Sequence, residues 1–170
     1  MELKDKIRSI PDFPKQGILF RDITTLLKDK DAYEELIRRL SESLKGLDVD
    51  LVVGPEARGF VIGSALAYAL HAGFVVARKP GKLPCETYRT EYGLEYGSDC
   101  LEIHKDAIIP GQKVAIVDDL LATGGTALAT AKLIESAGGE VVAMRFAIEL
   151  CDLGGRELLK NYDVKGIIQY

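Results

Sequence analysis

Two adjacent carboxylates, Asp118 and Asp119, lie where an apolar run meets a loop of small residues. The run at 114–117 is mostly β-branched, which is typical of a buried strand. The loop at 122–126 has no bulky side chain, and a helical pattern follows it. Free backbone N–H groups at a helix N-terminus bind anions. The stretch therefore predicts a phosphate in the loop and sugar hydroxyls on the two acids.

Each half of this predicted site has a plainer interpretation. The loop could be an ordinary turn between a strand and a helix, and it has neither the GxGxxG pattern nor the Gly-Lys-Ser/Thr ending of a Walker A loop. One acid could cap the helix while the other is solvated. However, adjacent carboxylates at the end of a buried strand repel each other and lose hydration. Vicinal ribose hydroxyls would use both as acceptors.

Alternating strands and helices would position these residues. Apolar runs predict strands at 49–53, 74–77, 114–117, 141–148 and 166–169. Apolar periodicity predicts helices at 31–45, with Asp29 or Asp31 as its cap, at 60–72, from the loop to about 137, and at 154–161. This order predicts an α/β fold with a mostly parallel, twisted sheet and helices on both faces. One domain, 1–170, accounts for the whole length.

In such folds, ligands bind beyond the carboxyl ends of the strands. Three strands end there in unusual loops, at 54–59, 78–82 and 118–126. The segment 83–104 is polar and rich in Tyr and Glu, and we expect a long hairpin or a mobile loop, which is usually functional. At the N-terminus, a short charged helix is expected over 2–9, before two prolines that prevent regular helix.

Composition limits the function. The net charge of −4 and pI of about 5.3 argue against general nucleic-acid binding. No apolar run approaches the length of a membrane span, and the start lacks the apolar core of a signal peptide. The cysteines and histidines form neither a disulfide framework nor a zinc pattern. A reducing, cytoplasmic location fits, and no metal-ligating cluster is expected from the chain itself.

The stretch VAIVDDLLATGGT at 114–126 resembles the phosphoribosyl-pyrophosphate (PRPP) signature of type I phosphoribosyltransferases. The similarity covers nearly the whole chain, with IPDFPKQGILFRDIT at 10–24, GPEARGF at 54–60, RKPGKLP at 78–84 and LEYGSDCLEIHKDAI at 94–108. The Asp-Asp form followed by LLATGGT is similar to that of the family members that use adenine. Cys85 and residues 86–93 match the family pattern least well.

This resemblance implies a reaction and an architecture. Adenine N9 would displace pyrophosphate from PRPP, giving AMP, with Mg²⁺ bound mainly through PRPP and pyrophosphate oxygens. An N-terminal hood, 1–30, would cover the base, and a flexible catalytic loop or hairpin would occupy about 83–104. The family is usually dimeric, so a homodimer is implied.

The resemblance also implies roles for individual residues. Asp118 and Asp119 would bind the ribose, and the 5′-phosphate would lie on Ala122, Thr123, Gly124, Gly125 and Thr126. Pyrophosphate would contact Glu56, Ala57, Arg58, Arg78, Lys79 and Lys82, with a cis peptide at Glu56-Ala57. Adenine would contact Leu19, Phe20, Arg21 and Leu120. The catalytic residues would be Glu95, Tyr96 and Arg58, with Glu95 exchanging a proton with the purine.

Other interpretations stay open at this stage. Arg58 could form a surface ion pair, Lys79 and Lys82 could belong to a solvated turn, and Leu19 and Phe20 could be core residues. The chain could be a regulatory protein of the same fold that binds PRPP or a nucleotide without turnover. It could also be an enzyme for hypoxanthine, guanine or xanthine.

Overall fold

The computed structural model describes residues 1–93 and 98–170. At its centre is a five-stranded sheet in the order β4-β3-β7-β8-β9, and every neighbouring pair is parallel. The strands are β3 (Leu51–Pro55), β4 (Gly73–Ala77), β7 (Lys113–Leu121), β8 (Glu140–Glu149) and β9 (Val164–Gln169). The predicted fold class is confirmed. The main boundary error is in β7, which continues through both acids to Leu121 rather than ending at Val117.

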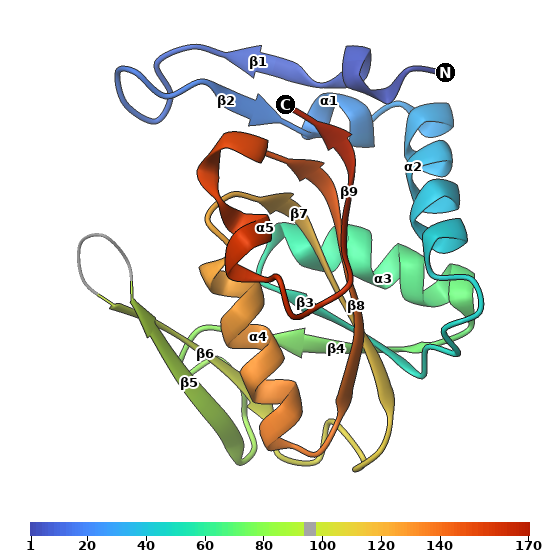
Figure 1. Ribbon diagram of the computed structural model, residues 1–170, viewed down its shortest axis with the longest axis vertical. Helices are drawn as coiled ribbons and strands as arrows, with labels where there is room; N and C mark the ends of the chain where they lie inside the picture. The colour runs from blue at the N-terminus through green and yellow to red at the C-terminus, as the bar shows by residue number, and fades with distance from the viewer. Residues whose placement is uncertain (94–97) are drawn as a thin grey trace.

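Helices cover both faces of the sheet (Figure 1). The helices α1 (Thr24–Leu27), α2 (Lys30–Ser43) and α3 (Arg58–Leu70) contribute to one apolar cluster, which includes Val52, Ala115 and Val117 of the sheet. The helix α4 (Gly125–Ser136) contributes to the cluster on the opposite face, with Val114 and Ile116. Consecutive β7 residues therefore bury opposite faces, which explains the near-continuous apolar run.

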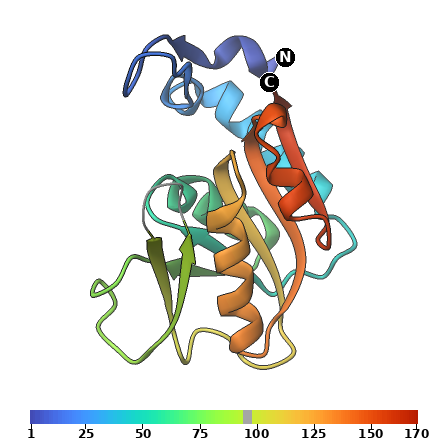
Figure 2. The same cartoon turned by 60° about the vertical axis from the view of Figure 1, so that its left-hand side comes forward.

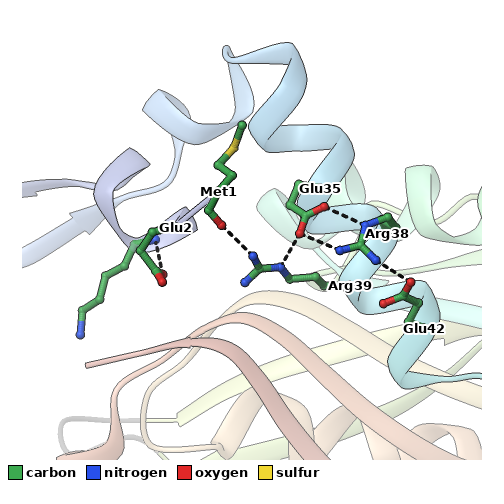
Figure 3. Close-up of polar contacts among 7 residues, drawn as sticks. Met1, Glu2, Glu35, Arg38, Arg39 and Glu42 are labelled. Carbon is green, nitrogen blue, oxygen red and sulfur yellow. Dashed lines mark hydrogen bonds and ion pairs between the residues drawn. The ribbon is translucent and has the colours of Figure 1, made fainter.

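The helix α2 begins where the sequence predicted. The Asp29 carboxylate accepts hydrogen bonds from the N–H groups of Asp31 and Ala32, both at 3.1 Å. On the exposed side of α2, Glu35 binds the guanidinium groups of Arg38 and Arg39 (Figure 3). Arg39 also donates to the backbone oxygen of Met1 at 2.7 Å, so this network ties the N-terminal segment to α2 (Figure 3).

The order of the strands creates a switch point beside β7. From β3 the chain first adds β4 on one side, and then adds β7, β8 and β9 on the other. The loops that leave β3 and β7 therefore diverge at the same edge of the sheet, where ligands bind in open α/β folds. Two of the three loops that the sequence analysis singled out, at 54–59 and 118–126, follow these two strands at this edge.

The predicted helix over 2–9 is wrong. A single 3-10 turn, η1 (Leu3–Lys6), is followed by β1 (Arg8–Ile10), which pairs antiparallel with β2 (Phe20–Asp22). Arg8 forms an ion pair with Asp22 at 2.5 Å. Pairing with β2 outweighs the local helical preference of the charged segment, because strand partners distant in sequence are invisible to a local pattern.

The β1–β2 pair lies above one end of the sheet, beside the C-terminus (Figures 1 and 2). The Tyr170 ring lies 3.8 Å from the Arg21 guanidinium carbon and 4.4 Å from the Lys4 ammonium nitrogen. Lys4 also donates to the backbone oxygen of Gln169 at 2.7 Å. We call residues 8–22 the hood, a shorter segment than the 1–30 region implied by the resemblance.

The hairpin prediction for 83–104 is confirmed in part. β5 (Thr87–Gly93) and β6 (Ser98–His104) pair antiparallel and lie beside α4 (Figures 1 and 2). This segment is not without a core, because Leu101 and Ile103 are buried against the α4 side of the sheet. Residues 94–97, between these two strands, lie outside the part of the chain that the structure describes.

The segment between the last two strands contains two short helical turns. The 3-10 turn η2 (Cys151–Leu153) and α5 (Gly155–Leu158) connect β8 to β9. The predicted helix at 154–161 is thus a single turn.

The cysteines Cys85, Cys100 and Cys151 are free thiols. Within 1–93 and 98–170, none of the helices combines the length and apolar character needed to cross a bilayer.

Candidate active site

A cavity of about 530 Å³ opens at the carboxyl ends of β3 and β7. It is a partly open space, and polar and apolar surfaces line it in similar measure. The lining residues come from the loop after β3, the end of β5, the end of β7 with the loop into α4, and two apolar side chains. They are Glu56, Ala57, Arg58, Tyr92, Gly93, residues 118–127, Phe146 and Leu158. The acids and the small-residue loop thus share one cavity with Arg58, as the sequence predicted.

The loop into α4 has the geometry of an anion site. Gly124 has a φ of +89°, a left-handed conformation that favours glycine, and α4 begins at Gly125. The first turn of α4 carries no acidic side chain. Its initial N–H groups lack intrahelical partners and bear the positive end of the helix dipole. A phosphate monoester fits there on charge and on hydrogen bonding.

The helix α5 supports this loop from behind. A β-carbon on Gly155 would lie 2.4 Å from the backbone oxygen of Ala122 and 2.8 Å from Leu121 Cδ1. A β-carbon on Gly124 would lie 3.1 Å from the backbone oxygen of Gly155. Two backbones therefore approach more closely than any side chain would allow. This contact fixes the position of the loop.

The two acids differ in their surroundings. Asp119 is 7% exposed and pairs with Arg58. Asp118 accepts a hydrogen bond from the N–H of Asp119 at 2.8 Å. Burial, followed by the neighbouring charge of Asp119, raises the pKa of Asp118 well above its usual value. A ligand that donates hydrogen bonds to Asp118, such as a sugar with free hydroxyls, would favour the ionised carboxylate.

Arg58 begins α3 and reaches across to β7. Its Nε donates to Asp119 Oδ2, while more than half of the side chain stays exposed. The hydrogen bond with Asp119 raises the pKa of Arg58. Arg58 thus forms an ion pair, as one interpretation of the sequence held, but its partner is a predicted ribose-binding acid rather than a surface group.

The peptide between Glu56 and Ala57 is cis, as the resemblance implied. Glu56 organises the neighbouring basic turn. Its carboxylate accepts from the Lys79 backbone N–H at 2.6 Å and from Lys82 Nζ at 2.5 Å, and it lies 3.4 Å from Arg78 Nε. Burial opposes ionisation, but these contacts outweigh it and lower the pKa of Glu56.

The basic turn is therefore not simply solvated. Lys82 is held by Glu56, and Lys79 Nζ lies 2.7 Å from Asp99 Oδ2. Neither lysine lines the cavity, and nor does Arg78. Of the six residues expected at pyrophosphate, the structure brings three to the cavity, namely Glu56, Ala57 and Arg58.

The residues expected at the base are divided between two places. Leu120 lines the cavity, whereas Leu19, Phe20 and Arg21 belong to the hood and are not among its lining residues. Leu19 is 49% exposed, so it is not a core residue. Phe20 packs edge-on against Phe13, with ring centroids 5.1 Å apart. Glu95 and Tyr96 lie outside the described residues.

Sequence reasoning missed Tyr92 and Leu158. Tyr92 follows Tyr88 by four residues in a strand, so the period of two places both on one face of β5. The aromatic residues of the polar segment were therefore a usable signal. No sequence pattern connects Leu158 with the loop, because their contact depends on how α5 packs against it.

Comparisons with known proteins agree with this geometry. A family model described as a phosphoribosyl transferase domain matches residues 22–169. Adenine phosphoribosyltransferase from Alkaliphilus metalliredigens is 64% identical over 170 residues, all of both chains. The crystal structure of the enzyme of that name from Thermoanaerobacter pseudethanolicus is 57% identical, with a TM-score of 0.97 over 99% of this chain and 98% of that one.

A third relative adds a ligand. The crystal structure of adenine phosphoribosyltransferase from Saccharomyces cerevisiae is a complex with an imino-altritol bisphosphate and adenine. It is 42% identical to this chain, with a TM-score of 0.93, and covers 98% of this chain and 97% of its own.

Proposed function

The chain belongs to the phosphoribosyl transferase domain family, and we propose that it transfers the phosphoribosyl group of PRPP to N9 of adenine. The products are AMP and pyrophosphate, so the enzyme salvages a purine base. One observation carries the proposal: a single cavity joins paired acids, a helix N-terminus and an arginine. The resemblance seen in the sequence is confirmed by the family match and by the full-length similarity to enzymes of this activity.

The sugar phosphate occupies the β7–α4 side of the cavity. The 5′-phosphate accepts hydrogen bonds from the loop 122–126, and the 2′- and 3′-hydroxyls donate to Asp118 and Asp119. Hydrogen bonds to charged acceptors are stronger than neutral ones, so the two acids hold the ribose in one orientation. This orientation places C1′ between the incoming base and the leaving group, which lowers the entropic cost of reaction.

Arg58 changes partner during the reaction. In the ligand-free geometry it neutralises Asp119, and ribose hydroxyls compete for the same carboxylate. Once they bind, the guanidinium is available to pyrophosphate, whose negative charge grows as the C1′–O bond breaks. Charge stabilisation that increases toward the transition state accelerates the reaction. The transition state has oxocarbenium character at C1′, as in glycosyl transfer generally.

Mg²⁺ is part of the proposal. Within the described part of the chain, no group of three or more His, Cys, Asp or Glu side chains is arranged to hold a metal ion. The oxygen-rich, acidic cavity nonetheless fits a hard cation that arrives on PRPP oxygens and keeps its waters. When bound, Mg²⁺ neutralises charge on the pyrophosphate. Activity that is unchanged after removal of Mg²⁺ with EDTA would contradict this part of the proposal.

Adenine binds between Leu120 and the hood. Leu120 supplies an apolar contact from the cavity side, and Phe20 offers an aromatic face from the hood. Backbone groups at Leu19 and Arg21 read the purine edge. Adenine and hypoxanthine reverse donor and acceptor at N1 and at the 6-position, so the wrong base leaves buried groups unpaired.

Base-dependent pyrophosphate release tests the proposal. Purified chain is incubated with PRPP and Mg²⁺, and pyrophosphate is measured with adenine, hypoxanthine, guanine or xanthine. We expect release with adenine at a kcat/KM at least a hundredfold above that of the other bases. Preference for another base would identify a different purine enzyme. PRPP binding without release on any base would identify a regulatory binding protein.

A homodimer is proposed from a surface groove. Residues on α2 and α3 line an open, mostly apolar hollow, and Tyr68, one of its lining residues, is 91% exposed. Its rim carries both signs of charge, from Lys30, Arg38, Glu34 and Glu42. In a twofold interface the same patch meets itself, so a rim of mixed sign is self-complementary. The cytoplasm is the proposed location.

Sedimentation equilibrium tests the dimer. We expect a mass of two chains for the wild type and one chain for Tyr68→Glu, which would place a charge in the interface. Ile109→Glu is the matched control, because Ile109 is 67% exposed and does not line the groove. A monomeric wild type would contradict the proposal, as would dimers in both variants.

A further inference from the structure

Four polar side chains connect the basic turn, the hairpin and the phosphate loop. Lys79 Nζ donates to Asp99 Oδ2 at 2.7 Å, and the Tyr92 hydroxyl lies 3.3 Å from the same oxygen. On its other side, the Tyr92 hydroxyl lies 3.5 Å from Thr126 Oγ1. The order is thus Lys79, Asp99, Tyr92, Thr126. It reaches from the turn after β4, through both strands of the hairpin, to the first turn of α4.

The Tyr92 ring also lies beside the loop. A β-carbon added at Gly125 would already be in van der Waals contact with the ring, at 3.6 Å from Tyr92 Cδ2. Tyr92 lines the cavity together with Gly125 and Thr126. The side chain therefore has two separable parts, a ring that supports the loop backbone and a hydroxyl that contacts a loop side chain.

The surroundings fix the direction of these hydrogen bonds. The contact with Lys79 lowers the pKa of Asp99, so Asp99 is ionised and can only accept. Burial raises the pKa of Tyr92, which keeps its single proton. Tyr92 therefore donates to Asp99. With that proton committed, the Thr126 hydroxyl must be the donor in any hydrogen bond with Tyr92.

A bound phosphate reverses the second contact. A phosphate dianion offers only acceptors, so Thr126 donates to the phosphate rather than to Tyr92. The Thr126 oxygen then presents lone pairs to Tyr92, which can satisfy them by turning its proton away from Asp99. Asp99 keeps Lys79 and the Cys100 N–H as donors, so it is not left unpaired. Hydrogen bonds in such a chain strengthen one another.

We infer that Tyr92 is a positioning residue for the 5′-phosphate: its hydroxyl shifts from Asp99 to Thr126 when a phosphate enters the loop. The inference rests on the proposed function, because it takes the loop as the 5′-phosphate site. Tyr92 contacts no reacting atom. It aims the Thr126 hydroxyl at the phosphate and transmits occupation of the loop to the Asp99–Lys79 pair.

Tyr92→Phe separates the hydroxyl from the ring. It keeps the packing on Gly125 and removes the hydroxyl. By isothermal titration calorimetry, we expect ribose 5-phosphate to bind about three- to tenfold more weakly, the usual effect of losing one hydrogen bond. KM for PRPP rises by a similar factor, while KM for adenine and kcat stay unchanged. Loss of the hydrogen bond to Asp99 lowers the melting temperature in either case, so a merely structural role is recognised by a lower melting temperature with normal ribose 5-phosphate binding.

Tyr88→Phe is the matched control. Tyr88 lies on the same strand, near Lys105 and away from the cavity, so its hydroxyl should not affect ribose 5-phosphate binding. A double-mutant cycle with Thr126→Val tests the route. If Tyr92 acts through Thr126, Tyr92→Phe weakens ribose 5-phosphate binding in the wild type but not in Thr126→Val. Additive effects would overturn the inference.

The two proposals fail in different ways. If the wild type releases pyrophosphate with adenine while Tyr92→Phe binds ribose 5-phosphate normally, the inference is overturned and the function stands. If Tyr92→Phe and Tyr88→Phe weaken ribose 5-phosphate binding equally, the inference about Tyr92 is likewise overturned while the proposed function stands. A wild type that neither binds ribose 5-phosphate nor turns over PRPP would overturn both.

Discussion

The β7–α4 half of the site and the hood are built in different ways. β7 is a nine-residue strand between β3 and β8, and Val114, Ala115, Ile116 and Val117 have no exposed surface. The hood is a pair of three-residue strands that are joined to each other by the Arg8–Asp22 ion pair, and the stack of Arg21 on Tyr170 attaches it to the C-terminal segment. Under the proposed function, the centre of the sheet would hold the sugar phosphate, and this small addition to the sheet would hold the base.

This difference separates two tasks. PRPP is the same substrate whichever purine accepts the phosphoribosyl group, so the PRPP site can be part of the most stable region of the molecule. The proposed contacts with the base lie on the hood, a segment that can change without altering the core. Variants in the two regions should therefore have distinct kinetic signatures.

Asp119→Asn should produce the largest effect. It removes a charged acceptor of the ribose hydroxyls and the partner of Arg58, and hydrogen bonds to charged groups contribute about 1.5–3 kcal/mol. We expect kcat/KM for PRPP to fall roughly 10- to 100-fold, with little change in melting temperature. Asp50→Asn is the control, because Asp50 binds the Lys113 N–H at the opposite end of β7. A loss of stability equal to that of the control, with normal kinetics, would assign Asp119 a structural role.

Gly155→Ala should displace the phosphate loop without touching a ligand. The new β-carbon would overlap Ala122, and overpacking of this kind costs about 1–3 kcal/mol. For a chain of this size the melting temperature should fall by roughly 2–4 °C per kcal/mol. KM for PRPP should rise more than KM for adenine. Glu157→Ala, an exposed change on the same helix, should leave both constants unaltered.

The pH dependence of ligand binding should report on Asp118. Its pKa is raised in the free chain, and donors from ribose lower it, so binding of ribose 5-phosphate releases a proton. Affinity should rise with pH until it passes the raised pKa and then level off. The free energy of unfolding changes with pH in the opposite direction. The folded chain binds more protons than the unfolded chain between the ordinary pKa of an aspartate and the raised pKa of Asp118, so the free energy of unfolding falls as the pH rises through this window.

Asp118→Asn checks both signs. Calorimetry in buffers of different ionisation enthalpy measures proton release, and melting temperatures are taken from about pH 4, near the ordinary pKa of an aspartate, upward. The variant should lose the proton release and the accompanying fall in stability. A wild type that releases no proton would contradict the raised pKa of Asp118.

Tyr170→Leu should give the smallest effect and a different signature. It removes the cation–π contacts with Arg21 and Lys4, which are worth about 0.5–1 kcal/mol at exposed sites. KM for adenine should rise roughly two- to fivefold, with KM for PRPP unchanged. Tyr33→Phe, which loses a contact with Val61 far from the hood, serves as the control. Equal changes in both Michaelis constants would contradict the separation of the two regions.

The sequence was most informative where local pattern and core position agree. The run at 114–117 and the residues that follow it predicted the strand, the acids and the loop, because a buried strand and a helix start both have local signatures. Asp29 was likewise one of the two residues predicted as the cap of α2. The alternation of elements was enough to predict the parallel sheet and its ligand-binding edge.

Contacts between distant segments escaped the sequence. No local pattern predicts that Arg58 pairs with Asp119 or that Glu56 accepts hydrogen bonds from the basic turn at 78–82. Nor does any local pattern predict that β1 pairs with β2. Each of these contacts depends on partners that the fold brings together, and the sequence around a charged residue does not indicate which partner it contacts. The roles of Glu95 and Tyr96 remain predictions from the resemblance.

The stack of Arg21 on Tyr170 attaches the hood to a distant segment, and the hydrogen bond from Lys4, just before the hood, to Gln169 spans 165 positions of the chain. During synthesis, the hood therefore leaves the ribosome before the segment to which it is attached. Contacts of such long range form late and slow the folding of a chain. The adenine side of the enzyme should therefore be the last part to become native, after the PRPP side is already in place.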